Sequence, residues 1–132
     1  MEKDGLLTYP TIDATFDIIF PWVEKVDPPD NSTNKEITTS ISATFNEPMR
    51  ISTITDSTFV LRDSNTNNHK VHVTINFDSD RKIATFKPTN NLSFNKWYRA
   101  TITTEVTDEK GNPMLFEKKW SFKTKESSPS VT

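Results

Sequence analysis

The amino-acid sequence predicts an all-β fold, an antiparallel sandwich of seven strands. Three observations predict this class: apolar and polar residues alternate along several segments, turn-forming residues separate these segments, and stretches with helical periodicity are short. Thr is abundant and Ala is sparse, which agrees with the residue preferences of strands rather than of helices.

The alternation of apolar and polar residues is clearest in three predicted strands, which cover residues 36–45, 71–77 and 98–106. Four weaker candidates complete the set: residues 22–26, 58–61, 82–86 and 116–124. We expect the core to consist of these residues: Ile37, Ile41, Phe45, Met49, Phe59, Leu61, Val73, Ile75, Phe86, Leu92, Tyr98, Ala100, Ile102, Trp120 and Phe122. Their burial, at about 25 cal/mol per Å2, offsets the chain entropy without disulfides or metal.

A tyrosine near the start of one predicted strand points to a particular kind of sandwich. Tyr98 follows Leu92 by six residues, at the position where Greek-key sandwiches place a tyrosine whose hydroxyl bonds the backbone of the preceding loop. Asn95 tolerates the positive φ that such a bend requires. The alternative is that Tyr98 is ordinary strand core. The first interpretation adds Greek-key connections to the predicted fold.

The length of 132 residues suits one domain. We expect the sandwich at residues 20–125, an N-terminal linker or edge extension at 1–19, and a polar C-terminal linker at 126–132. A formal net charge of −2 disfavours non-specific nucleic-acid binding. The absence of Cys excludes disulfides, zinc–thiolate sites and thiol nucleophiles. No apolar run has the length of a signal peptide or a membrane span, so we expect no direct membrane insertion.

Six motifs follow one another between about Val26 and Thr124. They are Pro-Pro-Asp-Asn at 28–31, Thr-Phe-Asn-Glu-Pro-Met at 44–49, Thr-Phe-Lys-Pro at 85–88, the strand of Tyr98, the turn from Asp108 to Pro113, and Trp-Ser-Phe-Lys-Thr at 120–124. Together they resemble the bacterial Ig-like domain of surface-layer proteins, the SbsA Ig-like or Big_5 family. The sequence departs from that family in having only two Gly, with Asn at several turns.

The resemblance implies an Ig-like sandwich that occurs, often in tandem, in microbial cell-surface and secreted proteins as a spacer, wall-associated or adhesive module. It implies no catalytic residues. We therefore expect a non-catalytic module of a larger chain, located extracellularly or at the cell surface. The expected partners are neighbouring domains of the same chain, together with cell-wall polysaccharide or another surface protein. The alternative is a carbohydrate-binding sandwich, which would present two or three coplanar exposed aromatic rings.

Glu47 is the acid that an enzyme would be expected to use. A glycosidase needs a second carboxylate about 5–10 Å away, and the sequence ties no second acid to Glu47. Pro48 cannot donate to a sheet ladder and restrains the preceding residue to an extended conformation, so it is predicted to end the strand. Glu47 is then expected to be solvated, and Met49 to fill the gap between the sheets.

Two loops carry the hard oxygen ligands that calcium prefers. One loop holds Asp108, Glu109 and Asn112, and the other holds Asp78 and Asp80. Neither loop has the alternating acidic spacing of a dedicated calcium site, and a hairpin built on Gly-Asn needs no metal. These residues are therefore candidates for calcium, while the expected cofactor is none.

The two histidines do not suggest a catalytic or metal centre. His69 and His72 are three residues apart in a predicted strand, which should point them to opposite faces. The sequence has no third His, and no Ser occupies a nucleophile elbow. Zinc and Ser-His-Asp catalysis therefore have no support.

The tryptophans are the candidates for ligand contact. Trp120 shares the parity of Phe116 and its apolar neighbours and is expected in the core, whereas Trp97 has the opposite parity to the core residues of its strand and should face outward. Trp22 and Trp97 are thus candidates for a sugar-binding surface. A lone exposed Trp more often covers a loop or an interdomain contact.

Overall fold

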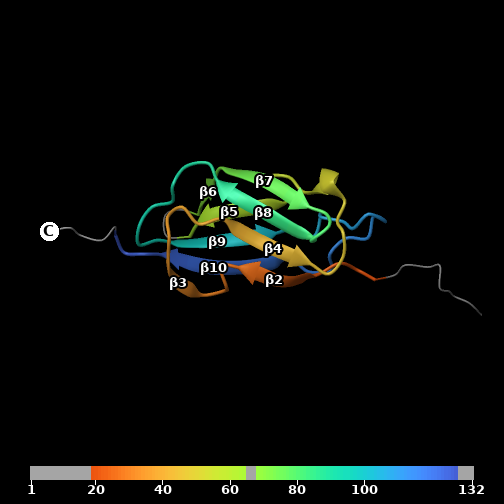
Figure 1. The fold of residues 1–132 in the computed structure, drawn as a ribbon, viewed down its shortest axis with the longest axis horizontal. Coiled ribbons are helices and arrows are strands. Elements are labelled where there is room, and N and C mark those ends of the chain that lie inside the picture. Colours follow the sequence, from red (N-terminus) through yellow and green to blue (C-terminus); the bar gives the residue numbers. More distant parts are fainter. Residues whose placement is uncertain (1–18, 65–67, 128–132) are drawn as a thin grey trace, which may run out of the picture.

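The structure is a computed structural model that describes residues 19–64 and 68–127. Two sheets lie face to face, as Figure 1 shows. The four-stranded sheet has the order β2 (Val23–Asp27), β4 (Ile41–Phe45), β8 (Ile83–Pro88) and β7 (Val73–Asp78). The five-stranded sheet has the order β3 (Ser32–Lys35), β10 (Lys118–Thr124), β9 (Trp97–Ile102), β5 (Phe59–Asp63) and β6 (His69–Val71). A short 3-10 turn, η1 (Ile51–Thr53), precedes β5.

The predicted all-β sandwich is confirmed, although the described residues contain nine strands rather than seven. The additional strands are β3, in a polar segment without alternation, and β6, which is separate from β7. β3 pairs with β10 in parallel, with Phe122 opposite Ser32, so the sandwich is not wholly antiparallel. The chain crosses between the sheets five times within the described residues: from β2 to β3, β3 to β4, β4 to β5, β6 to β7 and β8 to β9.

Three strands are shorter than the alternation predicted. β4 begins at Ile41 rather than at residue 36, β9 ends at Ile102 rather than at 106, and β10 begins at Lys118 rather than at 116. Beyond β9, the N–H of Val106 donates to the carbonyl of Thr103 in a turn (3.4 Å). Val106 is nevertheless fully buried. The alternation of apolar residues therefore continues beyond the strand, because a residue can be buried without pairing in a β-ladder.

Aromatic rings from both sheets form the centre of the core. Phe59 of β5 lies 5.4 Å from Phe86 of β8 and 6.1 Å from Phe45 of β4, between ring centroids. Phe86 also meets Trp120 of β10 at 6.1 Å, nearly edge to face. Of the expected core residues, all but three are buried. The three exceptions are half-buried and pack against the core: Ile37, Val73 and Ile75.

The predicted tyrosine corner is present. The hydroxyl of Tyr98 accepts a hydrogen bond from the backbone N–H of Ser93 (2.9 Å). Asn95 adopts a φ of 58°, and Leu92 is buried beneath the bend. This contact fixes the loop that leads from β8 into β9.

The chain enters and leaves the sandwich at opposite ends of its long axis (Figure 1). We call the end at which β2 begins the N-terminal end, and the end at which β10 finishes the C-terminal end. Most of the predicted N-terminal linker and C-terminal linker lies outside the described residues. Within the described ranges, no helix has the length and apolar character needed to cross a membrane.

Candidate functional site

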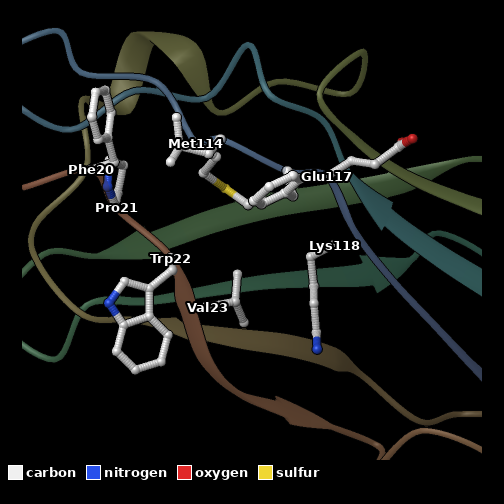
Figure 2. Close-up of a pocket in the computed structure, with 9 residues that line it drawn as sticks. Phe20, Pro21, Trp22, Val23, Met114, Glu117 and Lys118 are labelled. Atoms are coloured by element: carbon white, nitrogen blue, oxygen red, sulfur yellow. The ribbon is translucent and has the colours of Figure 1, made fainter.

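An apolar groove of about 290 Å3 lies at the N-terminal end of the sandwich, between residues 20–23 and residues 114–118 (Figure 2). Trp22 is 55% exposed and Phe116 is 80% exposed, while Met114 is buried. In Figure 2 the Trp22 ring lies on one side of Val23 and the Lys118 chain on the other. The groove is therefore an exposed apolar surface with a cation at its margin.

The side of the groove that holds Trp22 is fixed by a neighbouring strand end. The backbone N–H of Trp22 donates to Oδ1 of Asn46 (2.7 Å), and the N–H of Asn46 donates to the Trp22 carbonyl (3.0 Å). The opposite side precedes β10, so Phe116 lies outside the ladder and does not follow the parity of Trp120 into the core. Parity from β10 therefore does not predict where Phe116 lies.

The two tryptophans proposed as ligand contacts lie at opposite ends of the sandwich. Trp22 shares its groove with Lys118, at the start of β10, whereas Trp97 is opposite Lys123, near the end of β10. These two positions on β10 are about 17 Å apart along the strand. Trp97 faces outward and is half-buried. The two rings therefore do not form one coplanar surface for a sugar.

Asp108 is 1% exposed and organises the turn that follows it. Its Oδ1 accepts hydrogen bonds from the backbone N–H groups of Lys110 (2.9 Å) and Asn112 (2.8 Å). Its Oδ2 accepts one from Nδ2 of Asn112 (3.0 Å). Burial alone would raise the pKa of Asp108, but hydrogen bonds from Asn112, Lys110 and Glu47 hold the pKa below its ordinary value. The carboxylate therefore works as an internal acceptor that closes the turn.

The structure brings together only part of the calcium candidates. Asp108 and Asn112 meet, but the amide donates to the carboxylate, and Glu109 is exposed. In the other loop, Oδ1 of Asp78 accepts from the backbone N–H of Arg81 (3.2 Å), and Asp80 is exposed. Within residues 19–64 and 68–127, no three His, Asp or Glu side chains gather as metal ligands. These residues stay candidates for calcium, and the expected cofactor stays none.

Glu47 is not a solvated strand end. It is half-buried, and its side chain is one of the groups that hold the pKa of Asp108 below its ordinary value. Met49 is buried as expected and pairs with Asp108 through the backbone. The N–H of Arg50 donates to the carbonyl of Thr107 (2.9 Å). Two of the six sequence motifs are thus joined in space, and the second acid near Glu47 belongs to a structural turn.

His69 and His72 do not point to opposite faces of one strand. β6 ends at Val71 and β7 begins at Val73 in the other sheet, so the chain crosses between sheets at His72. Both histidines line one polar groove together with Asp63. The parity argument fails because it applies only within a continuous strand.

Residues 17–124 match the bacterial Ig-like domain family, Big_5. No curated protein matches the sequence. Among solved structures, the S-layer protein rSbsC(31-844) is 19% identical with a TM-score of 0.60, over 86% of this chain and 15% of that one. PcoC, a methionine-rich copper resistance protein from Escherichia coli, is 15% identical with a TM-score of 0.67, over 81% and 100%. CopC from Methylosinus trichosporium OB3b is 12% identical with a TM-score of 0.62, over 84% and 99%.

At these identities the likeness to solved structures shows the fold alone. The chain spans about 15% of the length of the S-layer protein that it matches. The family match covers most of the chain and includes all six motifs that carried the resemblance. The chain belongs to the bacterial Ig-like domain family.

Proposed function

We propose that this chain is a non-catalytic Ig-like module of a larger microbial surface or secreted protein, and that it spaces, orients or links its neighbours. Membership of the family supports this role. So does the small share of the S-layer protein that the module matches. The Glu47–Asp108 contact is internal to the turn, which favours structure over chemistry for the one close pair of acids considered above.

The observation that carries the proposal is the position of the two ends. The chain enters at β2 and leaves after β10 at the opposite end of the long axis (Figure 1). A pull between neighbouring modules therefore runs along the strands. β10 is hydrogen-bonded on both sides, to β3 and to β9, whereas β2 is an edge strand paired with β4 alone, so this pull would load one ladder at the entry and two at the exit. Such a geometry suits a stiff spacer.

The apolar groove supports a contact with the preceding module of the same larger protein. Its exposed rings, Phe20, Trp22 and Phe116, gather at the end where the chain enters the sandwich. Clustered apolar surface of this kind marks interaction sites rather than ordinary solvent-exposed surface. In this proposal the groove receives an apolar part of that neighbour.

The proposal is tested by pulling on the chain from its two ends in a single-molecule force experiment. We expect one all-or-none unfolding step, with a contour-length gain of roughly 350 Å for about a hundred residues. A Phe86→Ala variant, with its core contacts removed, should unfold at a lower force with the same gain in length. Gradual lengthening at low force, without a discrete step, would contradict a mechanical role.

A further inference from the structure

The outer face of the five-stranded sheet carries a concentration of cations. Five outward-facing side chains on four of its strands define what we call the basic face: Arg62, Lys70, Arg99, Lys119 and Lys123. Arg62 of β5 is directly opposite Arg99 of β9 and directly opposite Lys70 of β6. Three cations therefore form a row across three adjacent strands. Lys119 and Lys123 flank the position opposite Arg99 on β10.

This row is unfavourable for the isolated sheet. Like charges directly opposite one another on an antiparallel pair destabilise it. No ion pair within the described residues involves Arg62, Lys70 or Arg99. Oε2 of Glu117 lies 3.7 Å from Nζ of Lys119 at one margin of the face. Within the described residues no carboxylate forms an ion pair with the three cations of the row, which is typical of a binding surface rather than of the fold.

The basic face is also hollowed. A groove of about 290 Å3 runs over β10, β9 and β5, and the side chains of Arg62, Arg99 and Lys119 line it. The hydroxyl-bearing residues Thr101 and Thr103 line the same groove. Glu117, which pairs with Lys119, lines it as well, so the groove combines three cations and one carboxylate with groups that can both donate and accept hydrogen bonds.

We propose that the basic face binds an acidic polysaccharide, a polymer whose sugars carry carboxylate or phosphate groups. Guanidinium groups bind both kinds of anion in a bidentate way, and the threonine hydroxyls suit the hydroxyl groups of a sugar. Trp97 lies on the same face two residues from Arg99, where its ring offers a flat apolar surface. The inference rests on the proposed function in one respect: a module at the cell surface would encounter such a polymer.

The composition of the face favours a glycan over an acidic protein or a nucleic acid. A stable protein interface surrounds its arginine anchors with an apolar, well-packed centre, whereas on this face Lys70, Arg62 and Arg99 lie in one row. A nucleic acid is a denser polyanion, with one charge per about 1.7 Å of duplex. A chain with a net charge of −2 opposes that density, while a local row of cations suits a more sparsely charged polymer.

The test is a binding titration of the whole chain at low salt against polygalacturonate, dextran phosphate and neutral dextran. We expect binding to at least one of the two acidic polymers, weakening as salt rises, and none to dextran. The first polymer tests carboxylate and the second phosphate as the recognised group. Single-stranded DNA and vesicles that contain anionic lipid complete the set of probes. Equal or tighter binding to either would overturn the assignment to a polysaccharide.

Three double variants locate the site. Arg62→Gln with Arg99→Gln should weaken binding roughly tenfold for each arginine that contacts an anion. Lys25→Gln with Lys87→Gln removes the same charge from the four-stranded sheet and should change Kd less than twofold. Arg62→Lys with Arg99→Lys keeps the charge but loses bidentate contacts, so its affinity should be intermediate.

Thermal unfolding of each variant shows whether it is folded before binding is compared. If the arginine-to-glutamine variant does not fold, Lys119→Gln with Lys123→Gln on β10 takes its place. If the variant of the basic face and its control lost the same binding affinity, the effect would depend on net charge alone, and the proposal would be overturned. A lack of binding to both acidic polymers would also overturn it and would leave the force-bearing role untouched.

Discussion

The two sheets of this sandwich present very different surfaces to solvent. The five-stranded sheet presents the basic face, whereas strands β4, β8 and β7 of the four-stranded sheet present mostly neutral side chains: Ser42, Thr44, Thr74, Asn76 and Thr85. Lys87 and Asp78 are the charged residues at the outward positions of β8 and β7. Both faces follow the same period of two, so the difference lies in which residues occupy the outward positions.

This contrast shows what net charge conceals. A chain with 16 Lys and Arg against 18 Asp and Glu has no overall positive field. Cross-strand pairing nevertheless aligns Lys70, Arg62 and Arg99. A net charge near zero therefore does not exclude a local row of cations on one face.

The largest expected change in stability comes from a substitution in the core that both sheets share. Phe86→Ala removes a ring that contacts Phe59 and Trp120 across the sandwich. We expect the free energy of unfolding to fall by about 3–5 kcal/mol, from lost burial and a residual cavity. Urea denaturation followed by tryptophan fluorescence measures it. A loss below about 1 kcal/mol would mean that the two sheets do not depend on a common core.

A substitution outside both outer faces provides a reference for the effects of charge on stability. Asp108→Asn should lower the free energy of unfolding at pH 7 by about 1–3 kcal/mol, because buried donors lose their ionised acceptor. The pKa of Asp108 is lowered in the folded state, so its contribution is present above the unfolded pKa, near 3.8, and is lost as pH falls through the folded pKa.

Chemical denaturation between pH 7 and pH 2 measures this dependence. The Asp108→Asn variant should lose less stability in acid than the native chain does. Asp80→Asn, in an exposed turn, is the matched control and should behave as the native chain. If Asp108→Asn kept the full loss in acid, the dependence would have to arise from other carboxyl groups.

A smaller effect sharpens the comparison between the faces directly. Arg99→Thr should raise the free energy of unfolding by about 0.2–1 kcal/mol at low salt, because it relieves repulsion from Arg62. Lys87→Thr is the control on the other sheet, where we expect little change. The gain at Arg99 should shrink as salt screens the repulsion. A destabilised Arg99→Thr variant would mean that the cationic row is not under repulsion.

The smallest effect is expected at the apolar groove. Trp22→Ser and Phe116→Ser should each change the free energy of unfolding by no more than about 0.5 kcal/mol, because both rings are largely exposed. Thermal melting of the isolated chain measures it. A large loss would show that these rings stabilise the module itself, and the proposed contact with a neighbour would lose its basis.

The sequence predicted the parts of the fold that depend on local pattern. Ile41, Phe45 and Tyr98 are buried because period two places them on the inner faces. β3 was missed because its pairing with β10 depends on a partner far along the chain, not on apolar alternation. Phe116 was misplaced because the parity of a strand does not hold before the strand begins.

The candidate sites depended even more on long-range geometry. No local rule relates Glu47 to Asp108, although the fold joins them. The same holds for Arg62 and Arg99, which are neighbours only across the β5–β9 ladder. The residue types were visible in the sequence, but their juxtaposition depends on sheet register, which a single sequence shows only after the strand order is known.

The two proposals together would give β10, which pairs with β3 in parallel, two functions. β10 carries Lys119 and Lys123 outward, and it is also the strand through which the chain leaves the sandwich. A polymer held by these lysines would grip the same strand that transmits tension to the next module. Polymer binding and resistance to unfolding would then be lost at the same force, when β10 separates from its two neighbours. The force needed for that separation would set the upper limit of adhesion.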